Sequence, residues 1–189
     1  MRNAHSNSVV KLLRRHFPDA KIGAEIGVWQ GHFSEIILRE LPTVTLYCVD
    51  PWDSGGDHVT LPKVTPPQFK VAMEEYLRRT EPYADRRRTM YMASRTASLE
   101  IPNESLDFVF IDADHTFESV TEDMELWHSK VKVGGLFSGH DYNGKGDRTG
   151  FFGVKRAVDT FATKYGYPTA STMRGHVWWF TKQLEVKQP

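Results

Sequence analysis

The feature that most constrains the fold is an alternation of short apolar segments with amphipathic helical segments over the first two thirds of the chain. The apolar segments, which end in small or polar residues, are 21–27, 45–50, 88–94, 106–112 and 134–141. Between them, apolar residues recur at three- and four-residue spacing, as in 32–41, 68–79 and 117–131. Strands alternating with helices predict a parallel sheet whose crossovers are right-handed.

The last part of the chain has a different pattern. A helical segment at 153–166 is followed by two strand-like segments, 168–173 and 176–182, with Arg174 and Gly175 as a turn between them. This predicts an antiparallel hairpin at one edge of the sheet. We therefore expect a doubly wound α/β fold with a mostly parallel seven-stranded sheet and helices on both faces. It forms a single domain, 1–189, made of an N-terminal helix (1–20), a cofactor-binding core (21–142), and a C-terminal helix and hairpin (143–189).

Composition narrows the class of partner. The 189 residues include 24 basic and 24 acidic side chains, so the chain lacks the basic excess of proteins that bind nucleic acid or anionic membranes. Its one cysteine, Cys48, excludes an intrachain disulfide, and no segment has the length of apolar sequence that spans a membrane. We expect a cytoplasmic protein that acts on a small molecule, and the sequence leaves homo-oligomer formation open.

Residues suited to ligand binding or catalysis gather where the predicted strands end. Parallel sheets of this kind bind ligands outside the carboxyl ends of their strands. The residues at these ends are, in chain order, Glu25, Gly27, Asp50, Ser94, Asp112, Asp114, His140 and Asp141. The sequence therefore predicts a site along this edge of the sheet, whereas three other histidines, His5, His16 and His128, are expected on the surface.

The turn after the first strand brings backbone amides and a helix N-terminus close to a ligand. Its glycines, Gly23, Gly27 and Gly31, are each four residues apart, unlike the G-x-G-x-x-G of dinucleotide sites, which disfavours a nicotinamide dehydrogenase. Asp50 follows about twenty residues later, where a carboxylate can accept hydrogen bonds from a ribose diol. The ligand is therefore expected to contain a nucleoside.

At these residues the chain resembles class I methyltransferases, of the branch with the motifs AEIGVWxGxFSE, LYxVDPW, SLDFVFIDADHxxESVxxD and GHDY. The resemblance implies a Rossmann-like fold and the cofactor S-adenosylmethionine. It implies that the methionyl part lies against residues 25–31, the ribose on Asp50, and the adenine near Ala93 and Ser94. The predicted cofactor-binding residues are Glu25, Gly27, Trp29, Gly31, Asp50, Trp52, Ala93, Ser94 and Asp112.

Two mechanisms remain open on the acceptor side. In the first, Asp112, His140 and Asp141 bind a divalent cation, as metal-dependent catechol-type O-methyltransferases do at these strand ends. Oxygen ligands favour magnesium, but a histidine stands where those enzymes have a carboxylate, and a mixed nitrogen and oxygen set also suits manganese. In the second, His115 or His140 is a general base, oriented by Asp114 or Asp141.

The resulting functional prediction is methyl transfer to a hydroxyl of a small molecule, for example a sugar or a natural-product intermediate. The same residues are compatible with an N-methyltransferase or a metal-free O-methyltransferase. A non-catalytic nucleoside-binding module is a further alternative, although such a module has no need for a second set of titratable groups. The glycine-containing segments 52–67 and 143–150 are expected to cover the acceptor.

Overall fold

A computed structural model of the chain describes residues 4–53, 65–142, 153–168, 170–173 and 176–184. These residues form one seven-stranded sheet with the strand order β3-β2-β1-β4-β5-β7-β6. The strands are β1 (Ile22–Ile26), β2 (Thr45–Val49), β3 (Arg87–Met90), β4 (Leu106–Ile111), β5 (Val131–Gly139), β6 (Ser171–Met173) and β7 (Val177–Thr181). The first five pair in parallel, and β7 pairs antiparallel with both β5 and β6. The predicted doubly wound sheet and its antiparallel edge are confirmed.

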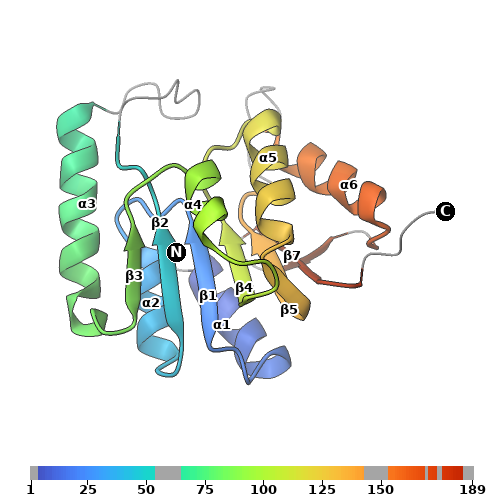
Figure 1. The fold of residues 1–189 in the computed structure, drawn as a ribbon, viewed down its shortest axis with the longest axis horizontal. Coiled ribbons are helices and arrows are strands. Elements are labelled where there is room, and N and C mark those ends of the chain that lie inside the picture. Colours follow the sequence, from blue (N-terminus) through green and yellow to red (C-terminus); the bar gives the residue numbers. More distant parts are fainter. Residues whose placement is uncertain (1–3, 54–64, 143–152, 169, 174–175, 185–189) are drawn as a thin grey trace.

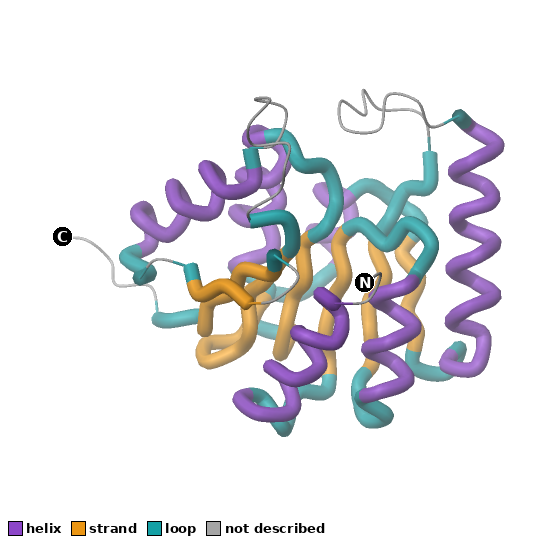
Figure 2. The backbone as a smooth tube through the Cα atoms, turned by 180° about the vertical axis from the view of Figure 1, so that it is seen from behind, coloured by secondary structure: helices purple, strands orange, loops and turns teal. Residues whose placement is uncertain are grey.

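Helices cover both faces of this sheet (Figures 1 and 2). They are α1 (Ala4–His16), α2 (His32–Glu40), α3 (Pro66–Thr80), α4 (Ser94–Glu100), α5 (Phe117–His128) and α6 (Val154–Tyr165), with a 3-10 turn at Glu81–Tyr83. Helices α1, α2 and α3 contribute to the apolar core on one face, and α4, α5 and α6 contribute to the core on the other. None of the described helices has the length and apolar character needed to cross a membrane.

The central strand β4 shows how the sequence builds two cores. Successive side chains of a strand point to opposite faces, so a strand covered on both sides is apolar at nearly every position. Phe108 and Phe110 pack into the core beneath α1 and α2, whereas Val109 and Ile111 pack into the core beneath α5 and α6. All four are at most 4% exposed. The near-continuous apolar run therefore predicts a central position in the sheet correctly.

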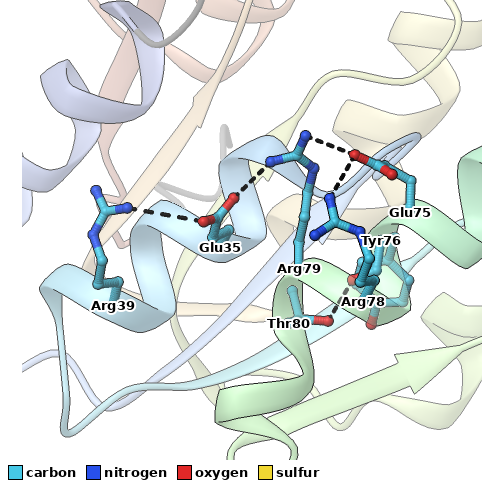
Figure 3. Close-up of polar contacts among 7 residues, drawn as sticks. All are labelled: Glu35, Arg39, Glu75, Tyr76, Arg78, Arg79 and Thr80. Carbon is cyan, nitrogen blue, oxygen red and sulfur yellow. Dashed lines mark hydrogen bonds and ion pairs between the residues drawn. The ribbon is translucent and has the colours of Figure 1, made fainter.

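Helix α3 is joined to α2 by charged side chains (Figure 3). Arg79 donates to Glu35 of α2 at 3.0 Å and to Glu75 of its own helix at 2.8 Å. Arg79 is only partly exposed, so this pair of contacts is less screened than an ordinary surface ion pair. The contact fixes α3 beside the segment that carries the glycine turn.

Several element boundaries differ from the sequence prediction, and two of them illustrate the cause. The helix expected over 117–131 ends at His128, because Val131 already pairs with Leu106 as the first residue of β5. The third strand ends at Met90, and Ser94 begins the short helix α4. Tertiary pairing decides both boundaries, and local periodicity does not register it. The expected acceptor-covering segments lie largely outside the described residues, at 54–64 and 143–152.

Candidate active site

A cavity of about 450 Å³ opens at the carboxyl ends of β1, β2 and β4, between these ends and the first turns of α4 and α5. Apolar side chains such as Val49 and Phe69 line it together with five acidic residues, Asp50, Asp112, Asp114, Glu122 and Asp123. Its volume lies in the range of small-molecule sites, about 300–1,000 Å³. The cavity thus occupies the edge of the sheet at which the sequence places the ligand.

The glycine turn after β1 forms one wall of the cavity. Gly27 has φ +87, and a Cβ added there would lie 2.3 Å from the carbonyl oxygen of Asp112. Its amide donates to the Val49 carbonyl at 2.9 Å, which ties the turn to β2. Trp29, two residues later, also has a positive φ, 53°, and lines the cavity. Glycine is required at position 27 because the backbones of two strand ends meet there.

Asp50 closes β2 and holds this turn in place. Its Oδ2 accepts hydrogen bonds from the backbone amides of Val28 (2.9 Å) and Trp29 (2.8 Å), and its Oδ1 accepts one from Trp52 (2.7 Å). A carboxylate offers about four acceptor positions, so roughly one is left for a ligand. The carboxylate therefore shapes the turn in addition to the ribose contact predicted for it, and a contact with both ribose hydroxyls requires one of these bonds to yield.

The predicted cofactor residues divide into two groups. Those that line the cavity are Gly27, Trp29, Asp50, Ala93, Ser94 and Asp112. The other three support it from behind. Glu25 is buried and accepts a hydrogen bond from Ser34. Gly31 begins α2 against the ring of Tyr76, and the indole of Trp52 donates to the Trp29 carbonyl at 2.8 Å.

Burial controls the protonation of Glu25. The absence of water raises its pKa well above the usual range, and the Ser34 hydroxyl opposes this only in part. This shift favours the protonated form, which carries no charge. Glu25 supports the turn from behind the cavity wall, and its direct contact with the cofactor stays a prediction.

Beside the cavity, two carboxylates and two imidazoles come together at the ends of β4 and β5. His115 Nε2 lies 3.4 Å from Asp112 Oδ1 and 3.0 Å from Asp141 Oδ2. His140 Nδ1 lies 3.6 and 3.3 Å from the same two oxygens. The four residues predicted to act on the acceptor thus form one cluster, which we call the acid–histidine cluster. Asp114, the fifth candidate, accepts instead from the Thr116 amide at 2.7 Å, at the start of α5.

The carboxylates and the imidazolium groups of the cluster stabilise each other's charged forms. Burial alone would lower the pKa of each imidazole, but Asp112 and Asp141 outweigh it and raise the pKa of His115 to about 9 and that of His140 to about 10. Burial would likewise raise the pKa of Asp112, but contact with the two histidines lowers it to about 2. The pKa of Asp141 is lowered for the same reason. At neutral pH the cluster holds two carboxylates and two protonated imidazoles.

The C-terminal hairpin fixes the turn that carries His140 and Asp141. Asp141 has φ 57, a left-handed conformation that is uncommon outside glycine, that aspartate adopts more readily than most residues, and that occurs at constrained functional turns. The Trp178 indole donates to the His140 carbonyl at 3.1 Å, and the Tyr142 amide donates to the His176 carbonyl at 3.1 Å. The strand β7 therefore braces the cluster from outside the parallel sheet.

Two residues near the site were missed by sequence reasoning. His5 of α1, expected on the surface, has its ring centroid 4.7 Å from that of His140, and it stacks near Phe33 and Phe110. Asp123 of α5 lines the cavity and is 6% exposed. Neither lies at a strand end, which was the signal used. For Asp123 the sequence offers two clues, its helical position facing a core that otherwise contains apolar residues and its place as the last residue of the motif SLDFVFIDADHxxESVxxD.

Comparisons with known proteins agree with this geometry. Residues 24–142 match the profile of a family described as a methyltransferase domain, and functionally curated proteins yield no match. The solved structure of the O-methyltransferase NovP is similar with a TM-score of 0.69 at 17% identity, covering 95% of this chain and 80% of NovP. An O-methyltransferase from Bacillus cereus in complex with S-adenosylhomocysteine (SAH) has a TM-score of 0.67 at 16% identity, over 94% of this chain and 80% of its own. The chain therefore belongs to the methyltransferase-domain family, as a class I S-adenosylmethionine-dependent methyltransferase.

Proposed function

We propose that this methyltransferase transfers a methyl group to a hydroxyl of a small molecule, such as a sugar or a natural-product intermediate. The observation that carries the proposal is the acid–histidine cluster, which lies directly beside the cavity and shares Asp112 and His115 with its wall. Hydroxyl methylation requires a group that takes or stabilises the departing proton, and this cluster supplies such groups. That NovP and the Bacillus cereus protein are O-methyltransferases supports the same acceptor class.

The cluster also fits a divalent cation. Asp112, His115 and Asp141 each offer one ligand atom, and these atoms lie within 4.8 Å of one another. A doubly charged ion would take the place of the two imidazolium charges that now balance the two carboxylates. The sequence predicted His140 as the histidine of this set, whereas His115 is the histidine grouped with the two carboxylates in the structure. We therefore propose Asp112, His115 and Asp141 as ligands, with His140 beside them, and a mixed nitrogen and oxygen set suits manganese as well as magnesium. When bound, the cation would supply Lewis-acid assistance to the hydroxyl.

The residues themselves can be assigned separate tasks. S-adenosylmethionine, when bound, supplies an electrophilic methyl group on a sulfonium centre. Asp112 and Asp141 are ionised and weakly basic, so they orient the acceptor hydroxyl by accepting its hydrogen bond. His115 and His140 are protonated at neutral pH, so either ring accepts the proton that leaves the oxygen only after it has lost its own, a loss that a cation bound to the two carboxylates would favour. The reacting atoms must approach in line at about 3 Å.

The test is a transfer assay with methyl-labelled S-adenosylmethionine and a panel of hydroxylated and amine-containing metabolites, with and without chelator. We expect label in a hydroxyl product, loss of activity on chelation, and recovery with manganese or magnesium. Asp141→Asn should lower turnover at least about 100-fold while SAH still binds, because the affected group acts on the acceptor. Asp85→Asn, which changes an exposed aspartate in the turn before β3, is the matched control.

The alternatives give different outcomes in the same assay. Label on an amine nitrogen would replace the hydroxyl proposal by N-methylation. Full activity in chelator, together with loss in His115→Gln and His140→Gln, would favour metal-free base catalysis. Binding of SAH without transfer to any member of a broad panel would favour a non-catalytic nucleoside-binding module.

A further inference from the structure

Ser94 stands at the cavity wall with its hydroxyl already engaged on both sides. Trp127 Nε1 donates to Ser94 Oγ at 2.8 Å, and Ser94 Oγ donates to Asp123 Oδ1 at 2.5 Å. An indole N–H can only donate, so the direction of this relay is fixed from Trp127 through Ser94 to Asp123. The one proton that Ser94 can donate is therefore committed within the protein.

Asp123 ends this relay in the cavity. Its side chain lines the cavity and is 6% exposed, and within the described residues the bond from Ser94 is the one hydrogen bond it receives. A buried carboxylate oxygen without a donor is costly, so a ligand N–H or O–H is expected opposite it. Burial raises the pKa of Asp123 to about 6, and Asp114 adds to this, so the group is ionised at pH 8.

The position of Asp123 relative to the strand ends indicates which part of the cofactor it meets. Gly27 and Asp50, at the ends of β1 and β2, occupy the part of the wall assigned to the methionyl and ribose groups. Asp123 is bonded to Ser94, which follows β3, the strand beyond β2 at the sheet edge. The remaining donor of S-adenosylmethionine at that end is the amino group of its adenine.

We propose that Asp123 recognises the base of the cofactor by accepting a hydrogen bond from its exocyclic amino group, with Ser94 and Trp127 as positioning residues that orient the carboxylate. This inference rests on the proposed function, since it takes the cavity to hold the methyl donor. An ionised Asp123 can accept a hydrogen bond from the base but cannot donate one. A carboxylate oxygen attracts the 6-amino group of adenine and repels the 6-oxo group of hypoxanthine.

The direction of the relay gives a sharp substitution test. In Asp123→Asn, an amide oxygen that replaces Oδ1 keeps the hydrogen bond donated by Ser94, and the amide nitrogen then faces the cavity as a donor. A donor at this position favours a 6-oxo base over a 6-amino base. The variant should therefore shift the base preference as well as weaken cofactor binding.

The experiment measures by calorimetry, at pH 8, the Kd values of SAH and of S-inosylhomocysteine, its 6-oxo analogue. Wild type should bind the adenosyl compound about 10- to 100-fold more tightly, as expected for a hydrogen bond to a charged group. Asp123→Asn should reduce this ratio at least 10-fold. Glu125→Gln, the same change two residues along α5 on a carboxylate that pairs with Lys164 and Tyr165, should leave the ratio as in wild type.

The possible outcomes separate the inference about Asp123 from the proposed function. An unchanged ratio in a folded Asp123→Asn protein overturns the inference and leaves the proposed function intact. If wild type does not bind SAH at all, the proposed function itself fails. If the variant does not fold, the test uses wild type and compares the Kd of SAH with that of its 6-deamino analogue. The analogue should bind at least 10-fold more weakly than SAH. Equal affinity overturns the inference.

Discussion

The buried His128 makes the acid sensitivity of this protein predictable. Its ring packs among Phe137, Phe161 and Tyr167, with centroids 5.4, 5.2 and 5.8 Å away, and its Nε2 lies 2.8 Å from the Tyr167 hydroxyl. Burial, assisted by the Lys182 ammonium, lowers the pKa of His128 from 6.5 to about 4. The folded protein therefore holds the imidazole neutral where the unfolded chain would protonate it.

The sign and size of the effect follow from linkage. Because the folded pKa lies below the unfolded one, this contribution to stability is complete above pH 6.5 and is lost as the pH falls toward 4. Between pH 7.5 and pH 4.5 the two pKa values correspond to a loss of about 2.5 kcal/mol. His128→Gln keeps a polar group near the Tyr167 hydroxyl but does not titrate. Between pH 7.5 and pH 4.5, the free energy of unfolding of the variant should therefore fall by about 2.5 kcal/mol less than that of wild type.

The assay is urea unfolding followed by circular dichroism at several pH values between 7.5 and 4.5. At pH 7.5 the free energy of unfolding of the variant is expected to be lower than that of wild type, because ring packing is lost. The comparison therefore uses the slope of this free energy against pH and not its absolute value. His16→Gln, which changes an exposed histidine, is the control. Parallel curves for wild type and His128→Gln would refute the reasoning.

Three further changes probe the site. Gly27→Ala should lower the free energy of unfolding by about 3 kcal/mol or more, because its Cβ would lie 2.3 Å from the Asp112 carbonyl oxygen at a positive φ; a loss below about 1 kcal/mol in urea titration would contradict this. Asp50→Asn should lower stability by about 2 kcal/mol and weaken SAH binding at least 10-fold, since its three backbone contacts cannot all be kept; unchanged affinity in calorimetry would argue against a role at the cofactor. His5→Phe, which preserves the ring packing, should reduce turnover about 10-fold with unchanged SAH affinity, and full turnover would remove His5 from the acceptor side.

Strand ends were the most predictable part of the site. The sequence places Asp112, His140 and Asp141 at the ends of β4 and β5, and a parallel sheet necessarily brings such ends to one edge. The topology itself follows from the alternation of periodicities along the chain. These two facts explain why a cluster assembled from residues about thirty positions apart was foreseeable.

What sequence reasoning missed depends on tertiary packing. His5 meets His140 only because α1 lies across the same face as α2, and His128 is buried only because α5 and α6 close over it. Local periodicity does not report how a helix is rotated once its neighbours are in place. Glu25 illustrates the same limit, because the sequence does not show that its carboxylate is buried and accepts a hydrogen bond from the Ser34 hydroxyl of α2.

The hairpin at the C-terminus has a consequence for engineering. Since Trp178 of β7 holds the carbonyl of His140 and His176, which directly precedes β7, holds the amide of Tyr142, a truncation before His176 would turn β5 into an open edge and free the acid–histidine cluster without deleting any of its residues. Redesign toward new acceptors is therefore best confined to segments inserted between the parallel strands. The hairpin then keeps the turn after β5 in place while the segments that decide acceptor specificity are changed.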